Sequence, residues 1–285
     1  MSRVWLITGA NTGIGLEIAL KALKEGDKVI AAVRSPEKVP EGLQGPDVST
    51  IKFDLSWSQE KVNGFAKEAV GAFGRVDVLV NNAGYAYMGG IEEISDEAVK
   101  EQYEINVFGI LRVIRAMLPY LRAQKSGLIL NFSSIGGFHG FPGNGIYCST
   151  KFALEGLTEA LAQEVAPFGI EAAIVEPGYF RTNFLASASA GQNLAPAMPE
   201  YESTPVGDAR RSFSKYNLKQ PGDPAILAER VWEYAAKKGL FVDRKRRLRL
   251  PLGSDTGAQL RAFIADLQET AEDYREVYES TDFKD

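Results

Sequence analysis

The stretch "ITGANTGIG", residues 7–15, is the most informative part of the sequence for the fold. It joins the apolar run "RVWLIT" to a segment with helical periodicity. Glycines at such a junction let the backbone approach a pyrophosphate, and the start of the helix supplies N–H groups and the positive end of its dipole. The spacing Gly9-x3-Gly13-x-Gly15 differs from the common G-x-G-x-x-G, so a purely structural glycine turn stays open at this stage.

Outward from this junction, short apolar runs alternate with longer helical patterns. Apolar strands between helices are typical of a parallel sheet that is covered on both faces. Strands are expected at residues 3–8, 28–33, 49–53, 76–80, 127–132, 170–175 and 247–252. Helices are expected near residues 14–25, 59–72, 96–122, 224–238 and 255–279, and around Tyr147. The pattern predicts an α/β fold with a doubly wound, Rossmann-type parallel sheet.

The chain shows no linker, so we expect one domain over residues 1–285. Residues 183–222 are rich in Ala, Ser, Pro, Gly and Asn, and a loop of that length is usually a functional lid or partly disordered. We expect it to be a substrate-binding loop. Its scattered apolar side chains are Phe184, Leu185, Leu194, Met198, Tyr201, Phe213 and Tyr216. The final helix, 255–279, carries the apolar stripe Leu260, Phe263, Ile264, Leu267, Ala271 and Tyr274.

Composition limits the classes of function. The formal net charge of −5 argues against a nucleic-acid-binding surface, and no apolar run approaches the length of a membrane span. The single cysteine, Cys148, excludes an intramolecular disulfide and fits a reducing compartment. The N-terminus lacks the layout of a signal peptide. We therefore expect a soluble, cytoplasmic protein without a metal site.

The second expected strand ends in "AAVRSPEK", where Arg34 and Ser35 follow Val33. A cofactor with a free ribose 2′-hydroxyl usually meets an Asp or Glu about 20 residues beyond the glycine loop, whereas an arginine suits a 2′-phosphate. The strand ends in Ala31, Ala32 and Val33, which offer no carboxylate, and Asp27 lies at the other end of the strand. The pattern favours NADP(H), with an ordinary exposed arginine as the alternative.

Polar residues also follow the other strands, at the edge where ligands bind in such folds. Asp54 follows the third strand, "NNAG" (81–84) the fourth, and "SS" (133–134) the fifth. "EPGYFRT" (176–182) ends the sixth strand. Asn106, in an otherwise apolar helical segment, is either a structural tie or part of the site, since a buried amide needs partners. Each feature has a structural explanation by itself. Together they indicate a ligand-binding site at the carboxyl ends of the strands.

Tyr147 and Lys151 stand four residues apart in "NGIYCSTKFALEGL", residues 144–157. On a helix, positions i and i+4 lie on the same face. A solvated helix face is one explanation for the pair. The other is that the lysine cation makes the phenol a better acid and base. Together with the positive ring of an oxidised cofactor it would favour the phenolate and bring the pKa of the tyrosine, normally about 10, closer to working pH.

These motifs, which cover residues 3–182, together resemble the short-chain dehydrogenase/reductase family. Further along the chain, "RLPLGSD" (249–255) and "ESTDF" (279–283) resemble the subgroup of 17β-hydroxysteroid dehydrogenases. The resemblance implies Tyr147 as general acid/base, Lys151 on the nicotinamide ribose, Ser134 on the substrate oxygen, and Asn106 holding a water beside Lys151. Ser133 is the rival of Ser134, whose spacing of 13 residues to the tyrosine matches the family. The cofactor-binding residues that it implies are Gly9, Asn11, Thr12, Gly13, Ile14, Gly15, Arg34, Ser35, Asp54, Leu55, Asn82, Ala83, Gly84, Tyr147, Lys151, Pro177, Gly178, Phe180 and Thr182.

The expected function is an NADP(H)-dependent oxidoreductase that interconverts a carbonyl and an alcohol on a hydrophobic, steroid-, polyketide- or terpenoid-like molecule. Relatives suggest a homo-oligomer. Two alternatives stay open: a dehydratase, epimerase or cyclase on the same scaffold, and a non-catalytic cofactor-binding protein. His139 has either a packing role or a substrate contact, Cys148 is expected to pack, and the basic run "RKRRLR" (244–249) is expected to be a solvated edge or a subunit surface.

Overall fold

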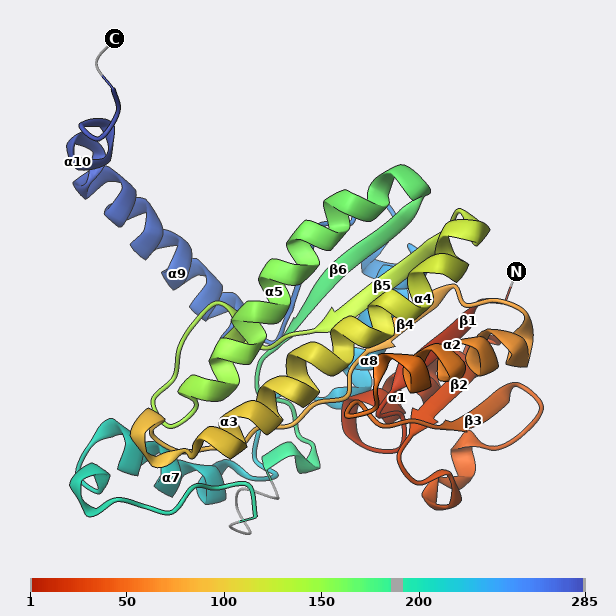
Figure 1. Ribbon diagram of the computed structural model, residues 1–285, viewed down its shortest axis with the longest axis horizontal. Coiled ribbons are helices and arrows are strands. Elements are labelled where there is room, and N and C mark those ends of the chain that lie inside the picture. Colours follow the sequence, from red (N-terminus) through yellow and green to blue (C-terminus); the bar gives the residue numbers. More distant parts are fainter. Residues whose placement is uncertain (1, 186–191, 284–285) are drawn as a thin grey trace.

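The computed structural model describes residues 2–185 and 192–283, and its central element is a parallel sheet of seven strands (Figure 1). The strand order is β3-β2-β1-β4-β5-β6-β7, and every neighbouring pair is parallel. The strands are β1 (Val4–Thr8), β2 (Lys28–Val33), β3 (Val48–Lys52), β4 (Val78–Asn81), β5 (Gly127–Phe132), β6 (Ile170–Pro177) and β7 (Arg249–Leu252). All seven predicted strands are confirmed, with ends shifted by up to two residues.

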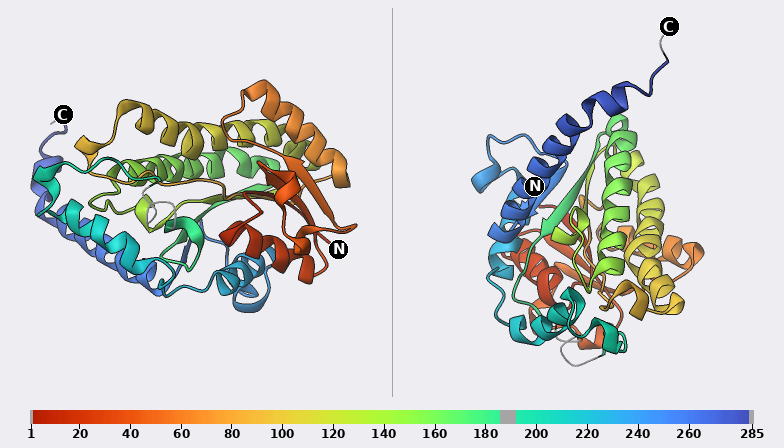
Figure 2. Two further views of the ribbon diagram at one scale, coloured as in Figure 1. Left: turned by 90° about the horizontal axis from the view of Figure 1, so that it is seen from below. Right: turned by 90° about the vertical axis from the view of Figure 1, so that its left-hand side faces the viewer.

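Helices cover both faces of the sheet, as the continuous apolar strands require. The helices are α1 (Gly13–Lys24), α2 (Gln59–Phe73), α4 (Ile110–Gln124), α5 (Gly145–Val165) and α8 (Pro224–Ala236). Side chains of α2, α4 and α5 share one buried cluster with one face of the strands, while α1 and α8 share a second cluster with the other face. Figure 2 shows these two helical layers with the sheet between them. The doubly wound fold is confirmed.

The sheet has a topological switch point beside β1. The chain crosses from β1 to β2 and β3 on one side, and then returns to β4 on the other side of β1. Open α/β sheets bind ligands in the crevice outside the carboxyl ends of the strands at such a point. In this chain the loops that follow β1 and β4 meet there.

The helix expected over residues 96–122 is present but is not regular throughout. It consists of α3 (Asp96–Tyr103), a π-helical segment (Glu104–Gly109) and α4. The wider π turn holds Asn106, which is fully buried. Single π turns inside α-helices are frequent at functional sites, and the apolar periodicity of the sequence gave no sign of this one.

The segment 183–222 is more structured than the sequence predicts. It contains the helix α7 (Pro205–Tyr216) and a short 3₁₀ turn (Pro199–Tyr201), while residues 186–191 of the predicted loop lie outside the described residues. The sequence analysis did not expect α7, although Thr204 and Pro205 are ordinary helix-start signals, and the role of the segment in substrate binding stays a prediction.

The C-terminal helix is confirmed but has two parts, α9 (Ser254–Asp273) and α10 (Arg275–Glu279), separated at Tyr274. Figure 1 shows α9 beginning against the end of the sheet and running away from the rest of the molecule.

Candidate active site

The glycine turn between β1 and α1 is shaped to hold a group that lies close to the backbone. Gly9 and Gly13 have φ angles of +69° and +55°, a region that favours glycine. Gly15 has no room for a side chain, because a Cβ there would lie 2.4 Å from the carbonyl oxygen of Gly9. Thr12 precedes α1 without a side-chain cap, so the first N–H groups of the helix are available to a ligand.

The "NNAG" loop after β4 is tied directly to this turn. The Thr8 hydroxyl accepts hydrogen bonds from the backbone N–H groups of Asn82 and Ala83, both at 3.0 Å. The Asn82 amide donates to the carbonyl oxygen of Thr8 at 3.0 Å. Gly84 lies beside two further candidate residues, since a Cβ on it would be 3.0 Å from Asn106 Oδ1 and 3.7 Å from Lys151 Nζ. The loop therefore joins the glycine turn to the candidate catalytic residues.

The predicted adenosine end of the cofactor site lies along β2 and β3. Arg34 follows the last residue of β2 and is exposed, and Ser35 next to it precedes a short 3₁₀ turn without a side-chain hydrogen bond to it. Asp54 follows β3, and its Oδ1 accepts hydrogen bonds from both the backbone N–H and the hydroxyl of Ser56. Leu55 is buried. Arg34 is thus the cationic side chain that the second strand presents at this edge.

The turn after β6 lies against the glycine turn. A Cβ on Gly13 would be 3.6 Å from the Thr182 side chain. At the start of the turn, the Gly178 N–H donates to the Leu252 carbonyl at 2.8 Å and the Tyr179 N–H donates to the Asp255 carboxylate at 2.7 Å. These bonds fix the Pro177–Thr182 segment to β7 and to the root of α9.

Ser134, Tyr147 and Lys151 lie together at the carboxyl end of β5. Tyr147 and Lys151 lie on one face of α5, with Lys151 Nζ 5.7 Å from the centre of the tyrosine ring. The Ser134 side chain lies close enough to the tyrosine hydroxyl to favour its phenolate form. The lysine ammonium is buried and donates to the Phe132 carbonyl oxygen at 2.8 Å. Among the described residues this is the one hydrogen bond of the ammonium, so two of its three N–H donors are left for other partners.

Burial dominates the electrostatic environment of Tyr147. It raises the pKa of the phenol above its ordinary value, and the nearby Ser134 side chain only partly offsets this. The expectation that Lys151 and the positive ring of an oxidised cofactor together favour the phenolate stays a prediction, and burial acts in the opposite direction. The physical reason is the loss of hydration, which penalises the phenolate. At neutral pH the hydroxyl is protonated and can act as an acid.

Lys151 is shifted in the opposite sense, by the same physical cause. Burial lowers its pKa to about 8, while the charge of Glu155 acts to raise it. A cation in this position is therefore close to losing its proton in mildly alkaline solution.

Asn106 is held by the protein at both ends of its amide. Its Nδ2 donates to the Tyr85 carbonyl at 2.8 Å and to the Thr150 hydroxyl at 3.1 Å, and its Oδ1 accepts from the Tyr85 N–H at 3.1 Å. These bonds join the π turn, the "NNAG" loop and α5. Asn106 is a structural tie next to Lys151, and its role in holding a water stays a prediction.

A buried group of charges beneath the site was not anticipated from the sequence. Ser133 donates to Glu155 at 2.7 Å, and Arg249 pairs with both Glu155 and Glu176. Burial, followed by the neighbouring Glu155, raises the pKa of Glu176 to about 7. The sequence contained one signal of this group, since Glu155 in "FALEGL" stands one helical turn after Lys151.

Ser133 is thus turned away from the tyrosine hydroxyl and toward Glu155. This geometry favours Ser134 over Ser133 as the residue that meets a substrate oxygen.

Apolar side chains of the lid segment gather beside Tyr147. Tyr147, Leu194 and Phe213 are partly buried and pack against the buried residues Ala86 and Met88. The Phe184 ring lies 5.8 Å from the Tyr147 ring. This part of the lid segment therefore forms an apolar wall at the candidate active site.

One carboxylate fastens the lid segment. Glu93 accepts hydrogen bonds from the N–H groups of Gly90 and Met198 and pairs with Arg210 of α7 at 2.6 Å. Burial acts to raise its pKa, but these hydrogen bonds outweigh it, and the pKa lies below its usual value.

Several residues singled out in the sequence have structural surroundings. Cys148 is buried, as predicted, and burial raises the pKa of its thiol. His139 packs edge-on against Phe141, and its contact with a substrate stays open. The basic run 244–249 is only partly a solvated edge, because Arg246 pairs with Glu171 and Arg249 is part of the buried charge group.

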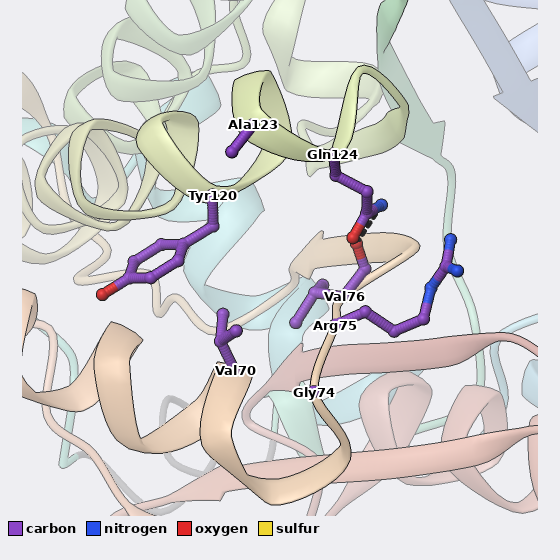
Figure 3. A pocket seen from close by; sticks show the side chains of 7 residues that line it. All are labelled: Val70, Gly74, Arg75, Val76, Tyr120, Ala123 and Gln124. Atoms are coloured by element: carbon purple, nitrogen blue, oxygen red, sulfur yellow. Dashed lines mark hydrogen bonds between the residues drawn. The ribbon is translucent and has the colours of Figure 1, made fainter.

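A cavity of about 380 Å³ lies between α2 and α4, near the amino end of β4 and away from all of these residues (Figure 3). Two of its polar side chains have partners in the protein: Gln124 donates to the Val76 carbonyl at 3.1 Å, and Arg75 pairs with Asp77. We assign it no role in catalysis.

The described residues contain no group of three or more His, Cys, Asp or Glu side chains that could hold a metal ion. None of the helices in the described part of the chain is both long enough and apolar enough to cross a membrane.

Comparison with known proteins agrees with this geometry. The family model described as short chain dehydrogenase matches residues 3–193. Oxidoreductase BOA17 of Botryotinia fuckeliana is 35% identical over 97% of this chain and 98% of its own length. Human 17-beta-hydroxysteroid dehydrogenase type 1 is 37% identical over 64% of this chain and 58% of its own length.

Among solved structures, a short-chain dehydrogenase from Streptomyces avermitilis is 37% identical with a TM-score of 0.87, over 99% of this chain and 100% of that one. Other solved structures with this fold carry NAD or NADP.

Proposed function

Because the chain belongs to the short-chain dehydrogenase family, we propose that it is an NADP(H)-dependent oxidoreductase that interconverts a carbonyl and an alcohol on a hydrophobic small molecule. The observation that carries this proposal is the meeting of Ser134, Tyr147 and Lys151 at the sheet edge that also holds the glycine turn. A protein that only binds a cofactor has no need for a protonated phenol, a serine hydroxyl and a buried ammonium in one place.

The residues present fit a dinucleotide. The space beside Gly15 and the uncapped start of α1 suit a pyrophosphate, which accepts hydrogen bonds from backbone N–H groups. Asn82 and Thr182 border this turn, and Lys151 has two ammonium donors for ribose hydroxyls. When bound, the nicotinamide supplies or accepts a hydride at the substrate carbon.

The protein's own part is to place the substrate oxygen and to move a proton. Ser134 can donate a hydrogen bond to that oxygen and stabilise the negative charge that develops on it during reduction. Tyr147, which is protonated at neutral pH, can then give its phenolic proton to the oxygen. Lys151 favours the phenolate that remains, because an adjacent positive charge stabilises an anion. In the direction of alcohol oxidation the same groups act in reverse.

The preference for NADP(H) over NAD(H) rests on Arg34. It is exposed at the tip of β2, beside Val33, where a carboxylate would otherwise meet the ribose hydroxyls. An arginine there offers a charge-assisted bond to a 2′-phosphate.

The substrate class rests on the apolar wall beside Tyr147. Phe184, Leu194 and Phe213 offer apolar surface rather than polar partners. A bulky apolar or polycyclic carbonyl compound suits such a wall better than a small polar one. The relationship to a protein named for hydroxysteroids points in the same direction.

The test is a panel of carbonyl compounds and alcohols of increasing size, with nicotinamide absorbance followed for each of the two cofactors. We expect turnover with NADPH and a higher kcat/KM for steroid-sized compounds than for acetaldehyde-sized ones. Comparable values for both sizes would overturn the substrate class. Product formation without net change in the cofactor would favour a dehydratase, epimerase or cyclase, and cofactor binding without any product would favour a binding protein.

A further inference from the structure

One guanidinium joins two of the segments that carry the proposed site. The Nη1 atom of Arg249, in β7, pairs with the carboxylates of both Glu155 in α5 and Glu176 in β6. The side chains of Glu155 and Glu176 are 4% and 0% exposed, whereas that of Arg249 is 36% exposed. None of these three side chains takes part in the proton transfer proposed above.

The first carboxylate holds the segment that leads to Ser134. Glu155 accepts the hydrogen bond of the Ser133 hydroxyl at 2.7 Å, and Ser133 is the residue directly before Ser134. Glu155 also stands one helical turn after Lys151, and its charge acts to raise the pKa of that ammonium. The direction in which Arg249 holds this carboxylate therefore affects both Ser134 and Lys151.

The second carboxylate precedes the turn that borders the glycine loop. Glu176 is followed directly by Pro177 and Gly178, the first residues of that turn. The backbone of β7 already holds the same turn, because the Gly178 N–H donates to the Leu252 carbonyl at 2.8 Å. The bond between Arg249 and Glu176 adds a side-chain connection between the same two strands.

The charges of this group depend on Arg249. Two carboxylates share its guanidinium, and the Lys151 ammonium donates to the Phe132 carbonyl oxygen instead of to either of them. Among the described residues, the second carboxylate oxygen of Glu176 is buried without a hydrogen-bond partner. Apolar replacements of buried ion pairs are often neutral or stabilising, so stability alone does not explain such a group. Its place between Ser134 and the turn after β6 suggests a role in the site.

We propose that Arg249 is a positioning residue of the proposed reaction. Through Glu155 it fixes the loop that carries Ser134, and through Glu176 it fixes the Pro177–Thr182 turn. It thereby sets the distance between the hydroxyl that meets the substrate oxygen and the nicotinamide that exchanges the hydride. This inference rests on the proposed function. A displacement of about 1 Å can lower the rate by about 10²-fold, even when the changed residue is far from the reacting atoms.

The experiment removes the guanidinium and then supplies it again from solution. In Arg249→Ala the space that the side chain leaves opens to solvent, because Arg249 is partly exposed, and free guanidinium ion can enter it. We expect kcat to fall by about 10- to 100-fold and NADPH to bind more weakly. Guanidinium chloride, at concentrations that leave the wild type folded, should restore most of both losses. Sodium chloride at the same concentrations should not.

Two further variants serve as controls. Arg247→Ala changes an exposed arginine of the same segment and should keep the wild-type values with and without guanidinium. The neutral variant, Glu155→Gln, Glu176→Gln, Arg249→Met, leaves no buried charge of this group unpaired, so it should fold. It should nevertheless show a lowered kcat, and it should not respond to guanidinium because it lacks the two carboxylates.

NADPH titration distinguishes positioning from a loss of folded protein. Partial unfolding lowers the number of binding sites per chain but leaves the affinity of the remaining sites unchanged, whereas a displaced turn lowers the affinity itself. Circular dichroism checks the folding of every variant.

Three results would overturn the proposal: a folded Arg249→Ala protein with wild-type kcat and NADPH affinity, a recovery that sodium chloride gives equally well, or wild-type values in the neutral variant. If Arg249→Ala does not fold, the neutral variant decides, and a neutral variant that also fails to fold would show that the charges serve the fold instead. A wild type without turnover on any compound of the panel would contradict the proposed function. The NADPH affinities of the same variants, with and without guanidinium, would then still test the positioning of the turn.

Discussion

Ser133 and Glu155 form a buried hydrogen bond of 2.7 Å between the serine hydroxyl and the carboxylate. The bond joins the end of β5, immediately before Ser134, to α5 one turn after Lys151. A Cβ on Gly137 would lie 1.9 Å from the same carboxylate oxygen, so the loop that carries Ser134 lies directly on Glu155. Glu155 therefore holds the residue next to Ser134 by a hydrogen bond, and its charge acts on the Lys151 ammonium.

Glu155→Gln should move the alkaline limb of the rate profile toward lower pH. The carboxylate acts to raise the pKa of Lys151, which burial has lowered to about 8. Without that charge the ammonium loses its proton more easily. The measurement is kcat against pH. Glu159→Gln, on an exposed position of the same helix, is the matched control and should leave the profile unchanged. An alkaline limb that stays in place or moves upward in a folded Glu155→Gln protein would contradict this role.

Tyr147→Phe should remove most of the activity and leave the cofactor bound. The substitution deletes one oxygen and keeps the ring that packs near Phe184. Proton transfer by a positioned side chain typically raises the reaction rate by about 10²–10⁴-fold, so kcat should fall by a factor of at least about 10². NADPH titration should give nearly the wild-type affinity. Near-full turnover in this variant would take the phenol out of the mechanism.

Lys151→Met should lower turnover and cofactor affinity together, because the ammonium serves both the phenol and the ribose. Its stability effect should depend on pH. The folded-state pKa of Lys151 lies below the unfolded value, so the unfolded chain binds more protons between about pH 8 and pH 10. The wild type should therefore gain stability relative to the variant as the pH rises through this interval. Denaturant unfolding of both proteins at several pH values measures the difference, and a constant difference would contradict the shift.

The sequence was sufficient for the sheet because its signals are local. Each apolar run predicts a strand by itself, and glycines or polar residues mark where the run ends, as in "ITGANTGIG". The location of the site at one edge of the sheet was predictable from the rule that parallel strands present their carboxyl ends together. The placement of Ser134, Tyr147 and Lys151 needed only this rule and the helical repeat.

The remaining features depend on contacts between distant segments. The π turn at Asn106 is stabilised by Tyr85 and Thr150, which no local pattern connects to it. The raised pKa of Tyr147 depends on its burial in the folded chain, and Arg249 reaches Glu155 across 94 positions of sequence. Neither periodicity nor composition contains that information.

Arg34→Asp should weaken NADPH binding by about ten- to a hundredfold, because a charge-assisted bond contributes roughly 1.5–3 kcal/mol. NADH should bind as well as before or better, since an aspartate can accept hydrogen bonds from ribose hydroxyls. Titration of both cofactors against both proteins provides the comparison. Lys38→Asp, at a nearby exposed position, controls for the change in overall charge. Equal affinity of the wild type for NADH and NADPH would show that Arg34 has no role in cofactor choice.

Glu93→Gln should loosen the lid without affecting the chemistry of the site. The Glu93 side chain is fully buried and holds Arg210 of α7 as well as the Met198 N–H, so the substitution leaves a buried guanidinium with a weaker partner. Such losses cost about 1–3 kcal/mol. We expect KM for a bulky substrate to rise about tenfold, with kcat for a small substrate little changed. Glu200→Gln, an exposed position of the same segment, is the matched control.

Acid should loosen the lid of the wild type as the Glu93→Gln substitution does at neutral pH. The pKa of Glu93 lies below its usual value of 4.5, so its contribution to lid docking is complete above that pH and is lost as the pH falls further. Limited proteolysis should be carried out at neutral pH and at pH values below 4.5. The protease should cut the wild type within residues 192–222 only at acidic pH, whereas it should cut the Glu93→Gln protein there at neutral pH as well. A Glu93→Gln protein that resists the protease at neutral pH and keeps the wild-type KM would show that the lid is held by its apolar contacts alone.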